Sequence, residues 1–295
     1  MTYKFIAIKF LCLMVLLAGT GSLVSAAGRN ASLLVEPEQL RQMLGSQDLV
    51  ILDVRSAASY QEGHIAGAVN LPVSDTFQQT GRTDRVAGPA HIQGLLGQAG
   101  IDRQKRVIIY DDGKFIDAGR MFWVLEVYGH NNAALLNYGF GGWLERGLPV
   151  SMDAYVPQPL AFLAVSQPNR LVTKLSMRLA TSSDAFTILD ARSAEEFNGK
   201  ESISSRYGHI PRAVNIPWSE NIAQDSDIPR VKTLDELTEV YRDLDPNKKV
   251  ITYCNKGKQS SFSYFVLRYM GYDVAHYDGS WFEWSTDENL PIVSP

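Results

Sequence analysis

Short runs of hydrophobic residues alternate along this chain with longer segments of helical pattern. Residues 50–52 (VIL) and 107–109 (VII) are continuous and rich in β-branched side chains, which is typical of strands buried on both faces of a sheet. The pattern predicts helices over residues 90–97, 120–128, 233–244 and 261–270. Strands that alternate with helices indicate an α/β fold, a mostly parallel sheet flanked by helices.

The pattern occurs twice. Residues 49–56 (LVILDVRS) recur as residues 186–193 (FTILDARS), and residues 62–72 (EGHIAGAVNLP) recur as residues 207–217 (YGHIPRAVNIP). Two further pairs follow in the same order: VIIYD at 107–111 with VITYC at 250–254, and YGFGGW at 138–143 with YDGSW at 277–281. Four matches in one order predict a duplicated domain.

The length of the chain agrees with this duplication, because 295 residues exceed the size at which a single hydrophobic core usually stops growing. Prolines at 157 and 159 resist continuation of a helix or strand and place a linker near residues 151–160. We therefore expect one α/β domain over residues 34–150 and a second over residues 161–295.

The N-terminal residues have the pattern of a secretory signal peptide. Lys4 and Lys9 precede a hydrophobic run over residues 10–18, and small residues follow at 24–27 (VSAA). Residues 1–26 are the expected signal peptide, with cleavage after Ala26 or Ala27. The alternative is an uncleaved membrane anchor, but the run is short for a hydrocarbon core of roughly 30 Å. We expect export, to the periplasm in a Gram-negative source, without stable membrane insertion after cleavage.

Composition limits the partners. Hydrophobic residues make up 45% of the chain and charged residues 20%, and the net charge is -4 without a long basic run. Nucleic acid is not an expected partner, because binding phosphates requires clustered Lys and Arg.

Cysteine is rare in this sequence. Of the two cysteines, Cys12 lies in the predicted signal peptide, so the mature protein would retain Cys254 alone and form no internal disulfide. A lone cysteine can be an inert buried residue. The neighbours of Cys254 favour a reactive one instead.

Cys254 follows the predicted strand 249–253 and precedes a helix, at the sheet edge where α/β proteins bind ligands. The backbone N–H groups of such a loop can converge on one point, and Gly257 lets the backbone bend there. Lys256 and Lys258 add positive charge, and together these features favour the thiolate and an anionic substrate. Of the two lysines, one could be a solvated surface residue, and we favour Lys256 as the one that faces the substrate.

These motifs resemble the rhodanese family of sulfurtransferases over nearly the whole mature chain. The resemblance rests on the Asp-x-Arg stretches, the Gly-His-Ile segments and residues 277–284 (YDGSWFEW). It implies two tandem rhodanese-like domains, an inactive first one with Asp111 in place of the cysteine and a catalytic second one. It also implies that Cys254 takes a sulfur atom from an anionic donor as a persulfide and passes it to cyanide or a thiol.

The loop sequence bears on the donor. Members of the family that use thiosulfate typically have Cys-Arg-Lys-Gly, and those that use mercaptopyruvate have Cys-Gly-Ser-Gly, whereas this chain has CNKG at 254–257. The resemblance implies thiosulfate as donor, with 3-mercaptopyruvate, or a persulfide carrier without turnover, as alternatives. It implies that Arg192, Lys256 and Lys258 bind the donor and that the loop residues Asn255, Gly257 and Gln259 stabilise the persulfide. The alternative role for Arg192 is an ion pair with Asp190.

Other candidate residues have structural explanations. His64 and His209 share one Gly-His-Ile context although only one copy has a nucleophile, which favours a shared structural role. Three tryptophans near the ends of the two copies are expected in the core: Trp143, Trp281 and Trp284. Adjacent acids at 111 and 112 are weak evidence for a metal, so we expect no metal and no organic cofactor.

Two other cysteine chemistries do not fit. A phosphatase loop needs an arginine that clamps phosphate where this chain has Ser260 and Ser261. Thioredoxin-like redox chemistry needs a second cysteine in Cys-x-x-Cys, which is missing after Cys254.

Overall fold

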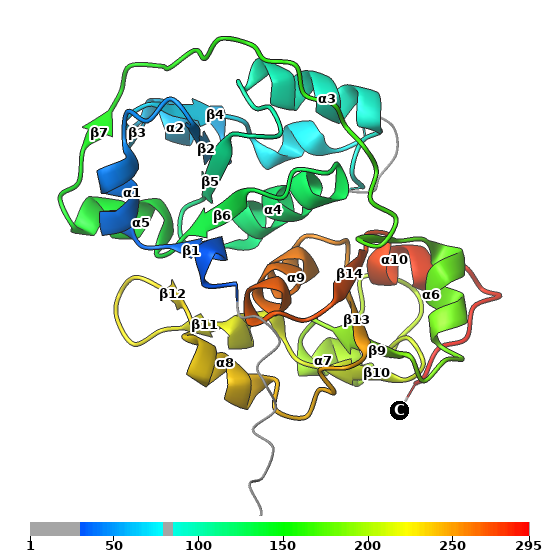
Figure 1. Cartoon of the computed structure of the whole chain (residues 1–295). Helices are drawn as coiled ribbons and strands as arrows, with labels where there is room; N and C mark the ends of the chain where they lie inside the picture. Colours follow the sequence, from blue (N-terminus) through cyan, green and yellow to red (C-terminus); the bar gives the residue numbers. More distant parts are fainter. Residues whose placement is uncertain (1–29, 79–84, 295) are drawn as a thin grey trace, which may run out of the picture.

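The computed structural model describes residues 30–78 and 85–294, which form two α/β domains (Figure 1). Each contains a five-stranded sheet, in the order β1-β6-β5-β2-β4 in the first domain and β8-β14-β13-β9-β10 in the second. Neighbouring strands within both sheets pair in parallel. The strand order is the same when the sheets are read by repeat position, which confirms the predicted pair of α/β domains. The predicted signal peptide, residues 1–26, lies outside the described residues.

The first domain runs from a short 3-10 helix to the end of its last strand. Its elements are η1 (Ala31–Leu33), β1 (Leu34–Val35), α1 (Pro37–Met43), β2 (Leu49–Asp53), α2 (Ala57–Gln61), β3 (His64–Ile65), β4 (Ala68–Asn70), η2 (Val73–Thr76), α3 (Pro89–Gln98), β5 (Arg106–Tyr110), α4 (Ile116–Val127), β6 (Ala133–Leu136), α5 (Gly139–Glu145) and β7 (Val150–Ser151).

The second domain repeats the order of the five sheet strands, but its antiparallel pair is β11 with β12, whereas that of the first domain is β3 with β7. Its elements are β8 (Leu171–Val172), α6 (Lys174–Ala180), β9 (Phe186–Asp190), α7 (Ala194–Phe197), β10 (Ala213–Asn215), η3 (Trp218–Asn221), β11 (Ile222–Ala223), β12 (Arg230–Val231), α8 (Leu234–Val240), β13 (Lys249–Tyr253), α9 (Gln259–Met270), β14 (Val274–Tyr277) and α10 (Ser280–Ser285).

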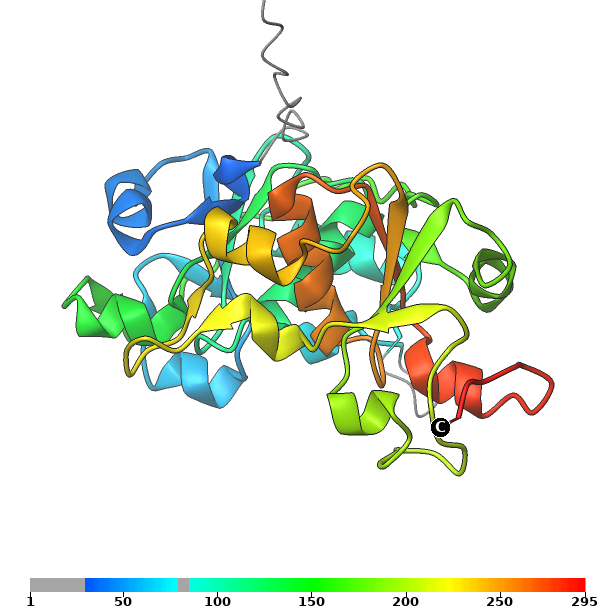
Figure 2. The same cartoon turned by 90° about the horizontal axis from the view of Figure 1, so that it is seen from below.

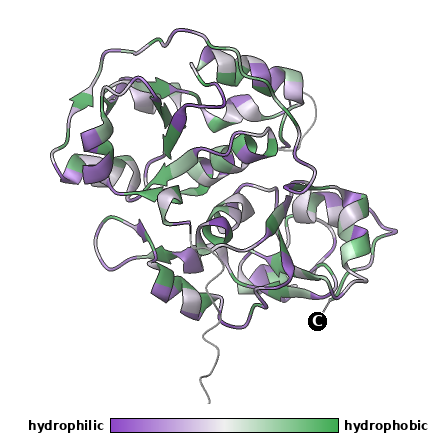
Figure 3. Cartoon of the chain, viewed as in Figure 1, coloured by the Kyte–Doolittle hydropathy of each residue, from purple (hydrophilic) through white to green (hydrophobic). Residues whose placement is uncertain are grey.

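The central strands are buried on both faces, as their continuous hydrophobic runs predict. Residues 107–110 of β5 and 250–253 of β13 are all buried. Figure 3 shows hydrophobic residues along the strands of both domains and along α4. Removal of this apolar surface from water is the main term that favours folding. It holds the carboxyl ends of β5 and β13 at fixed positions in the sheets.

Helix starts follow local capping signals. The Thr233 hydroxyl accepts from the Glu236 N–H, and the Glu236 carboxylate accepts from the Thr233 N–H, which forms a capping box at the start of α8. The helix predicted over residues 233–244 ends earlier than expected, at Val240, because Leu244 bonds back to the carbonyl of Tyr241 in a turn. The helices predicted over 90–97, 120–128 and 261–270 are α3, α4 and α9.

Residues 152–170, all of them described, form a connector without helix or strand. The connector runs along the outside of the first domain (Figure 1), where Leu160 N–H donates to Gly97 O across 2.9 Å and Gln167 N–H to Val127 O across 2.7 Å. The predicted linker, residues 151–160, is the first half of this segment. The first strand of the second domain, β8, begins ten residues after the expected boundary at 161, at Leu171.

Helices α4 and α9 lie side by side between the two sheets (Figures 1 and 2). Phe115 stacks on Phe262 with ring centroids 5.4 Å apart, and Phe122 meets Phe265 edge-on at 5.1 Å. The backbones approach closely at Gly119, where an added Cβ would lie 2.7 Å from the Cα of Phe262. The first domain is therefore packed directly against the helix that follows the cysteine loop.

None of the helices in the described ranges has the length and hydrophobicity needed to cross a lipid bilayer.

Candidate active site

Cys254 directly follows β13, the central strand of the second sheet, and is 1% exposed. Its backbone N–H and carbonyl both form hydrogen bonds with residues at the start of α10. Its N–H donates to the Oγ of Ser280 across 3.2 Å, and its carbonyl accepts from the Trp281 N–H at 2.9 Å. These bonds fix the cysteine between strand and helix, at the carboxyl edge of the sheet where the sequence predicts it.

The loop after Cys254 bends at Gly257, whose φ of +83° lies in the left-handed region that favours glycine. The Gly257 N–H donates to the Cys254 Sγ, with 3.2 Å between the two atoms. Its carbonyl accepts from the Oγ of Ser261 at 2.5 Å and from Nη1 of Arg120 at 3.2 Å. A donor aimed at sulfur favours negative charge on that atom.

The sulfur-bearing loop opens on a pocket of about 330 Å³ between the two domains. Its walls are Ile116, Ile203, Cys254, Asn255, Lys256, Lys258 and Gln259. Six of these residues belong to the second domain, and Ile116 is contributed by α4 of the first. The structure thus brings five predicted site residues, Asn255, Lys256, Lys258, Gln259 and the cysteine, to one cavity.

The two lysines of the loop differ in their environment. Lys256 is exposed, with Nζ 5.6 Å from the centroid of the Phe282 ring. Lys258 forms an ion pair with Asp117 of α4, with 2.7 Å between Nζ and Oδ1. Asp117 thus offsets the charge of Lys258, a residue that the sequence predicts to bind the donor. Asp117 was not among the predicted site residues.

Asn255 and Gln259 tie the loop to its surroundings. The Nδ2 of Asn255 donates to the Oε1 of Glu196 at 2.6 Å, which links the loop to α7. Gln259 is the first residue of α9. Both side chains belong to the pocket wall.

Arg192 lies beneath the site in a buried ion pair. Its Nε and Nη2 bond both carboxylate oxygens of Asp190, with 2.6 Å between Nη2 and Oδ2, and Nη2 also donates to Gly208 O. This pair is the alternative role that the sequence left open for Arg192. The side chain is fully buried and does not line the pocket, and its Nη1 has no hydrogen-bond partner among the described residues.

The first domain contains the same ion pair without a nucleophile. Arg55 bonds Asp53 with 2.5 Å between Nη2 and Oδ2, and Nη2 also donates to Gly63 O. In each copy a tyrosine hydroxyl completes the group, Tyr110 on Asp53 at 2.6 Å and Tyr253 on Asp190 at 2.5 Å. A feature present in both copies is explained by their shared fold rather than by sulfur chemistry.

The two histidines also occupy matching structural positions. His64 Nδ1 donates to Tyr60 O at 2.8 Å and stacks on that ring, and His209 Nδ1 donates to Phe197 O at 2.9 Å and stacks on that ring. This confirms the predicted structural role. The predicted core tryptophans are buried as expected: Trp143, Trp281 and Trp284.

Asp111 occupies the position of the cysteine in the first domain. Its Oδ1 accepts from the N–H groups of Gly113 and Phe115 at 2.8 and 3.1 Å, and its Oδ2 accepts from that of Ala118 at 3.2 Å. Burial raises the pKa of this carboxyl to about 6, against the three N–H donors that lower it. The loop of the first domain is thus filled by its own side chain.

Several residues of the site were missed by the sequence reasoning. Asp278 Oδ1 pairs with Arg120 Nη1 at 2.6 Å, and its Oδ2 accepts from the Val86 N–H of the first domain at 2.9 Å. Ser280 holds the cysteine backbone. Asp278 and Ser280 lie in the repeated segment 277–281, so the repeat itself could have drawn attention to them. Arg120 and Asp117 act across the domain interface, and no pattern within the repeat indicates this role.

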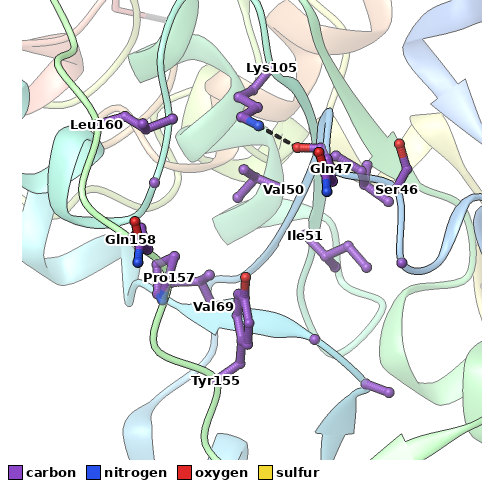
Figure 4. Close-up of a pocket in the computed structure, with 15 residues that line it drawn as sticks. Ser46, Gln47, Val50, Ile51, Val69, Lys105, Tyr155, Pro157, Gln158 and Leu160 are labelled. Atoms are coloured by element: carbon purple, nitrogen blue, oxygen red, sulfur yellow. Dashed lines mark hydrogen bonds between the residues drawn. The ribbon is translucent and has the colours of Figure 1, made fainter.

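A larger pocket, of about 570 Å³, lies elsewhere on the first domain (Figure 4). On one side it is lined by the connector residues Tyr155, Pro157 and Gln158. On the other side lies the segment before β2, whose Gln47 carbonyl accepts from Lys105 Nζ. Its lining comes only from residues 45–160 and includes no cysteine. The smaller pocket at Cys254 is therefore the candidate active site.

Two α/β domains of one topology, of which only the second has a cysteine in its loop, define a duplicated rhodanese-type protein. A family model described as "Rhodanese-like domain" matches residues 36–146 and 172–287. The chain therefore belongs to the rhodanese family.

The similar proteins are sulfur-transferring enzymes that are named for two donors, thiosulfate and 3-mercaptopyruvate. The chain is 32% identical to a thiosulfate sulfurtransferase of Pseudomonas aeruginosa over 266 residues, which cover 88% of this chain and 96% of the relative. It is 32% identical to the Azotobacter vinelandii thiosulfate sulfurtransferase, covering 88% and 96% of the two chains. The crystal structure of the 3-mercaptopyruvate sulfotransferase SseA of Escherichia coli matches with a TM-score of 0.75 at 27% identity, over 84% of this chain and 98% of that one. The chain is a sulfurtransferase.

Proposed function

We propose that this sulfurtransferase moves a sulfane sulfur atom from thiosulfate to a thiophilic acceptor through a persulfide on Cys254. The observation that carries the proposal is the hydrogen bond from the Gly257 N–H to the Cys254 Sγ, at the wall of a pocket that also contains Lys256. A sulfur atom held by an amide donor beside a cation is suited to act as a nucleophile toward an anion.

The reaction takes place in two displacements at sulfur. The Cys254 thiolate attacks the outer sulfur of thiosulfate, the S–S bond of the donor breaks, and sulfite leaves with the bonding electron pair. Cyanide or a thiolate then attacks the outer sulfur of the persulfide, which yields thiocyanate or a new persulfide and restores the Cys254 thiolate. No net oxidant or reductant is consumed.

Lys256 orients the anionic donor in this proposal. One cation about 4 Å from an anion contributes on the order of 1 kcal/mol in water and about 4 kcal/mol at an effective dielectric constant near 20. Lys256→Ala should therefore raise the KM for thiosulfate several-fold or more. Lys114→Ala, at an exposed lysine in the matching loop of the first domain, is the control and should leave KM unchanged.

The test of the proposal is sulfite release from thiosulfate with cyanide as acceptor, for the wild-type protein and Cys254→Ser. We expect turnover in the wild type and none in the variant, with mass spectrometry detecting one additional sulfur atom on Cys254 after donor alone. Turnover with 3-mercaptopyruvate but not with thiosulfate would show that 3-mercaptopyruvate, not thiosulfate, is the sulfur donor. A persulfide that forms once without steady turnover would identify a carrier.

We propose in addition that the protein is exported. Support comes from the charged start, the hydrophobic run and the small-residue end of residues 1–27. Expression in a Gram-negative host should yield periplasmic protein whose first residue follows Ala26 or Ala27. Cytoplasmic protein that retains residues 1–26 would contradict this.

A further inference from the structure

The first domain reaches the active pocket through the start of helix α4. Ile116 forms part of the pocket wall, and the next residue, Asp117, pairs with Lys258 across the domain interface, with 2.7 Å between Oδ1 and Nζ. About a third of each side chain of this pair is exposed, 36% for Asp117 and 35% for Lys258. The carboxylate that pairs with Lys258 thus comes from the domain that has no nucleophile.

This pair changes the charge that an entering molecule meets. The loop contains two lysines, but the charge of Lys258 is offset by Asp117, whereas Lys256 has no carboxylate within ion-pair distance among the described residues. The pair therefore lowers the positive charge that the loop presents by about one, and the Glu196 carboxylate, which accepts from Asn255 Nδ2 at 2.6 Å, is a further negative charge beside the loop. Because the pair is partly exposed, its influence on other charges is screened by water and salt.

We infer that Asp117 is a specificity-determining residue: by neutralising Lys258, it limits the preference of the Cys254 pocket for doubly charged anions over singly charged or neutral molecules. Removal of the Asp117 charge should increase the affinity of the pocket for a monoanion by some factor. The affinity for a dianion should increase by about the square of that factor, because the Coulomb energy scales with ligand charge. The inference rests on the proposed function only in taking Cys254 as the reacting atom. It assigns the inactive domain a part in substrate choice.

The test uses two alkylating agents that differ in charge. Iodoacetate is an anion and iodoacetamide is neutral, so the ratio of their rates at Cys254 reports the local charge and cancels the intrinsic reactivity of the thiolate. In Asp117→Asn the ratio should rise about twofold at low ionic strength, as expected for the removal of one charge about 10 Å away in water. At high salt the rise should shrink.

The matched control is Asp112→Asn, which makes the same change of charge at an acid of the same segment that pairs with Lys114 at 3.4 Å. The ratio in this variant should match the wild type. Equal ratios for Asp117→Asn and wild type would overturn the inference, as would an equal rise in both variants, which would indicate a general charge effect. Alkylation requires no turnover, so this result is independent of whether thiosulfate is the donor.

Steady-state kinetics provide the second measurement. In Asp117→Asn, the KM for dianionic thiosulfate should fall more than that for monoanionic 3-mercaptopyruvate, with a change about twice as large on a logarithmic scale. If Asp117 serves only to fasten the two domains together, stability falls and the ratio of the two KM values stays constant, which would refute the inference. A wild-type protein inert toward both donors would refute the proposed function instead, and the alkylation ratio would still decide the role of Asp117.

Discussion

The backbone N–H of Gly257 points at the sulfur of Cys254, with 3.2 Å between nitrogen and Sγ. Gly257 is held from the other side as well, because its carbonyl accepts from Ser261 and from Arg120 of the first domain. The donor is thus oriented before any substrate arrives, which is the condition under which a hydrogen bond stabilises developing charge most effectively.

Gly257→Ala should reduce sulfur transfer strongly. The φ of +83° costs a residue with a side chain about 1–2 kcal/mol, and the new Cβ would lie 2.8 Å from Asp278 O and 2.9 Å from Asp278 Oδ1, so the loop must move. We expect a loss of tenfold or more in kcat/KM, measured as sulfite release.

Gly45→Ala provides the control for this variant. Its φ is +80°, nearly the same, but an added Cβ would meet no atom within 4 Å. It should lower the free energy of unfolding by a similar backbone cost while activity is retained. Full activity in Gly257→Ala would show that the hydrogen bond from the backbone N–H of residue 257 to the Cys254 sulfur is dispensable for sulfur transfer.

Arg192→Met and Arg55→Met should destabilise the protein by comparable amounts. Each removes the guanidinium from a buried carboxylate, Asp190 or Asp53, and loss of one partner of a buried pair typically costs about 3–5 kcal/mol. Urea denaturation measures both. The milder Arg192→Lys should leave the KM for thiosulfate near the wild-type value, since Arg192 does not line the pocket. A large rise in KM without loss of stability would show instead that Arg192 binds the substrate.

The sequence was sufficient to predict those features that depend only on residues within one copy of the repeat. The hydrophobic runs at 107–109 and 250–253 and the turn at Gly257 are local patterns, so both sheets and the position of Cys254 could be predicted. Comparison of the copies also identified the structural histidines, because His64 lies in a domain without a nucleophile. The same comparison applied to Arg55 favours the ion pair for Arg192.

Contacts between the copies could not be predicted in this way. Asp117 and Arg120 lie on α4 and act on Lys258 and Gly257 of the other domain, so no spacing within either repeat reports them. Which helix faces which depends on how the two domains pack, and this is decided by aromatic contacts distant in sequence, such as Phe122 with Phe265.

The pair of Arg120 and Asp278 should be strongly coupled in a double-mutant cycle. Arg120→Met alone leaves Asp278 at the interface without its guanidinium and is expected to cost about 3–5 kcal/mol. Asp278→Asn added to it removes the stranded charge, so the double variant should be more stable than the sum of the single variants predicts, by about 0.5–3 kcal/mol. Additive free energies from urea denaturation would show that the pair contributes no specific coupling.

The stability of the protein should depend on pH through Asp111. Burial raises the pKa of this carboxyl from its usual value near 3.8 to about 6, so between these values the folded state binds more protons than the unfolded chain. Its contribution to stability is complete below about pH 4 and is lost as the pH rises to about 6, a decline on the order of 3 kcal/mol.

Asp111→Asn removes this titration and should flatten that part of the stability curve. His276 acts in the opposite direction, since burial lowers its pKa to about 3 and stability is lost as the pH falls below about 6.5. The wild-type curve alone therefore mixes the two groups, whereas the difference between wild type and Asp111→Asn isolates Asp111. The free energy of unfolding is measured by urea denaturation from pH 4 to pH 8 for both proteins. The variant should gain stability relative to the wild type as the pH rises to about 6, and the difference should stay constant above that pH. Parallel curves would show that the three N–H donors keep the pKa of Asp111 near its ordinary value.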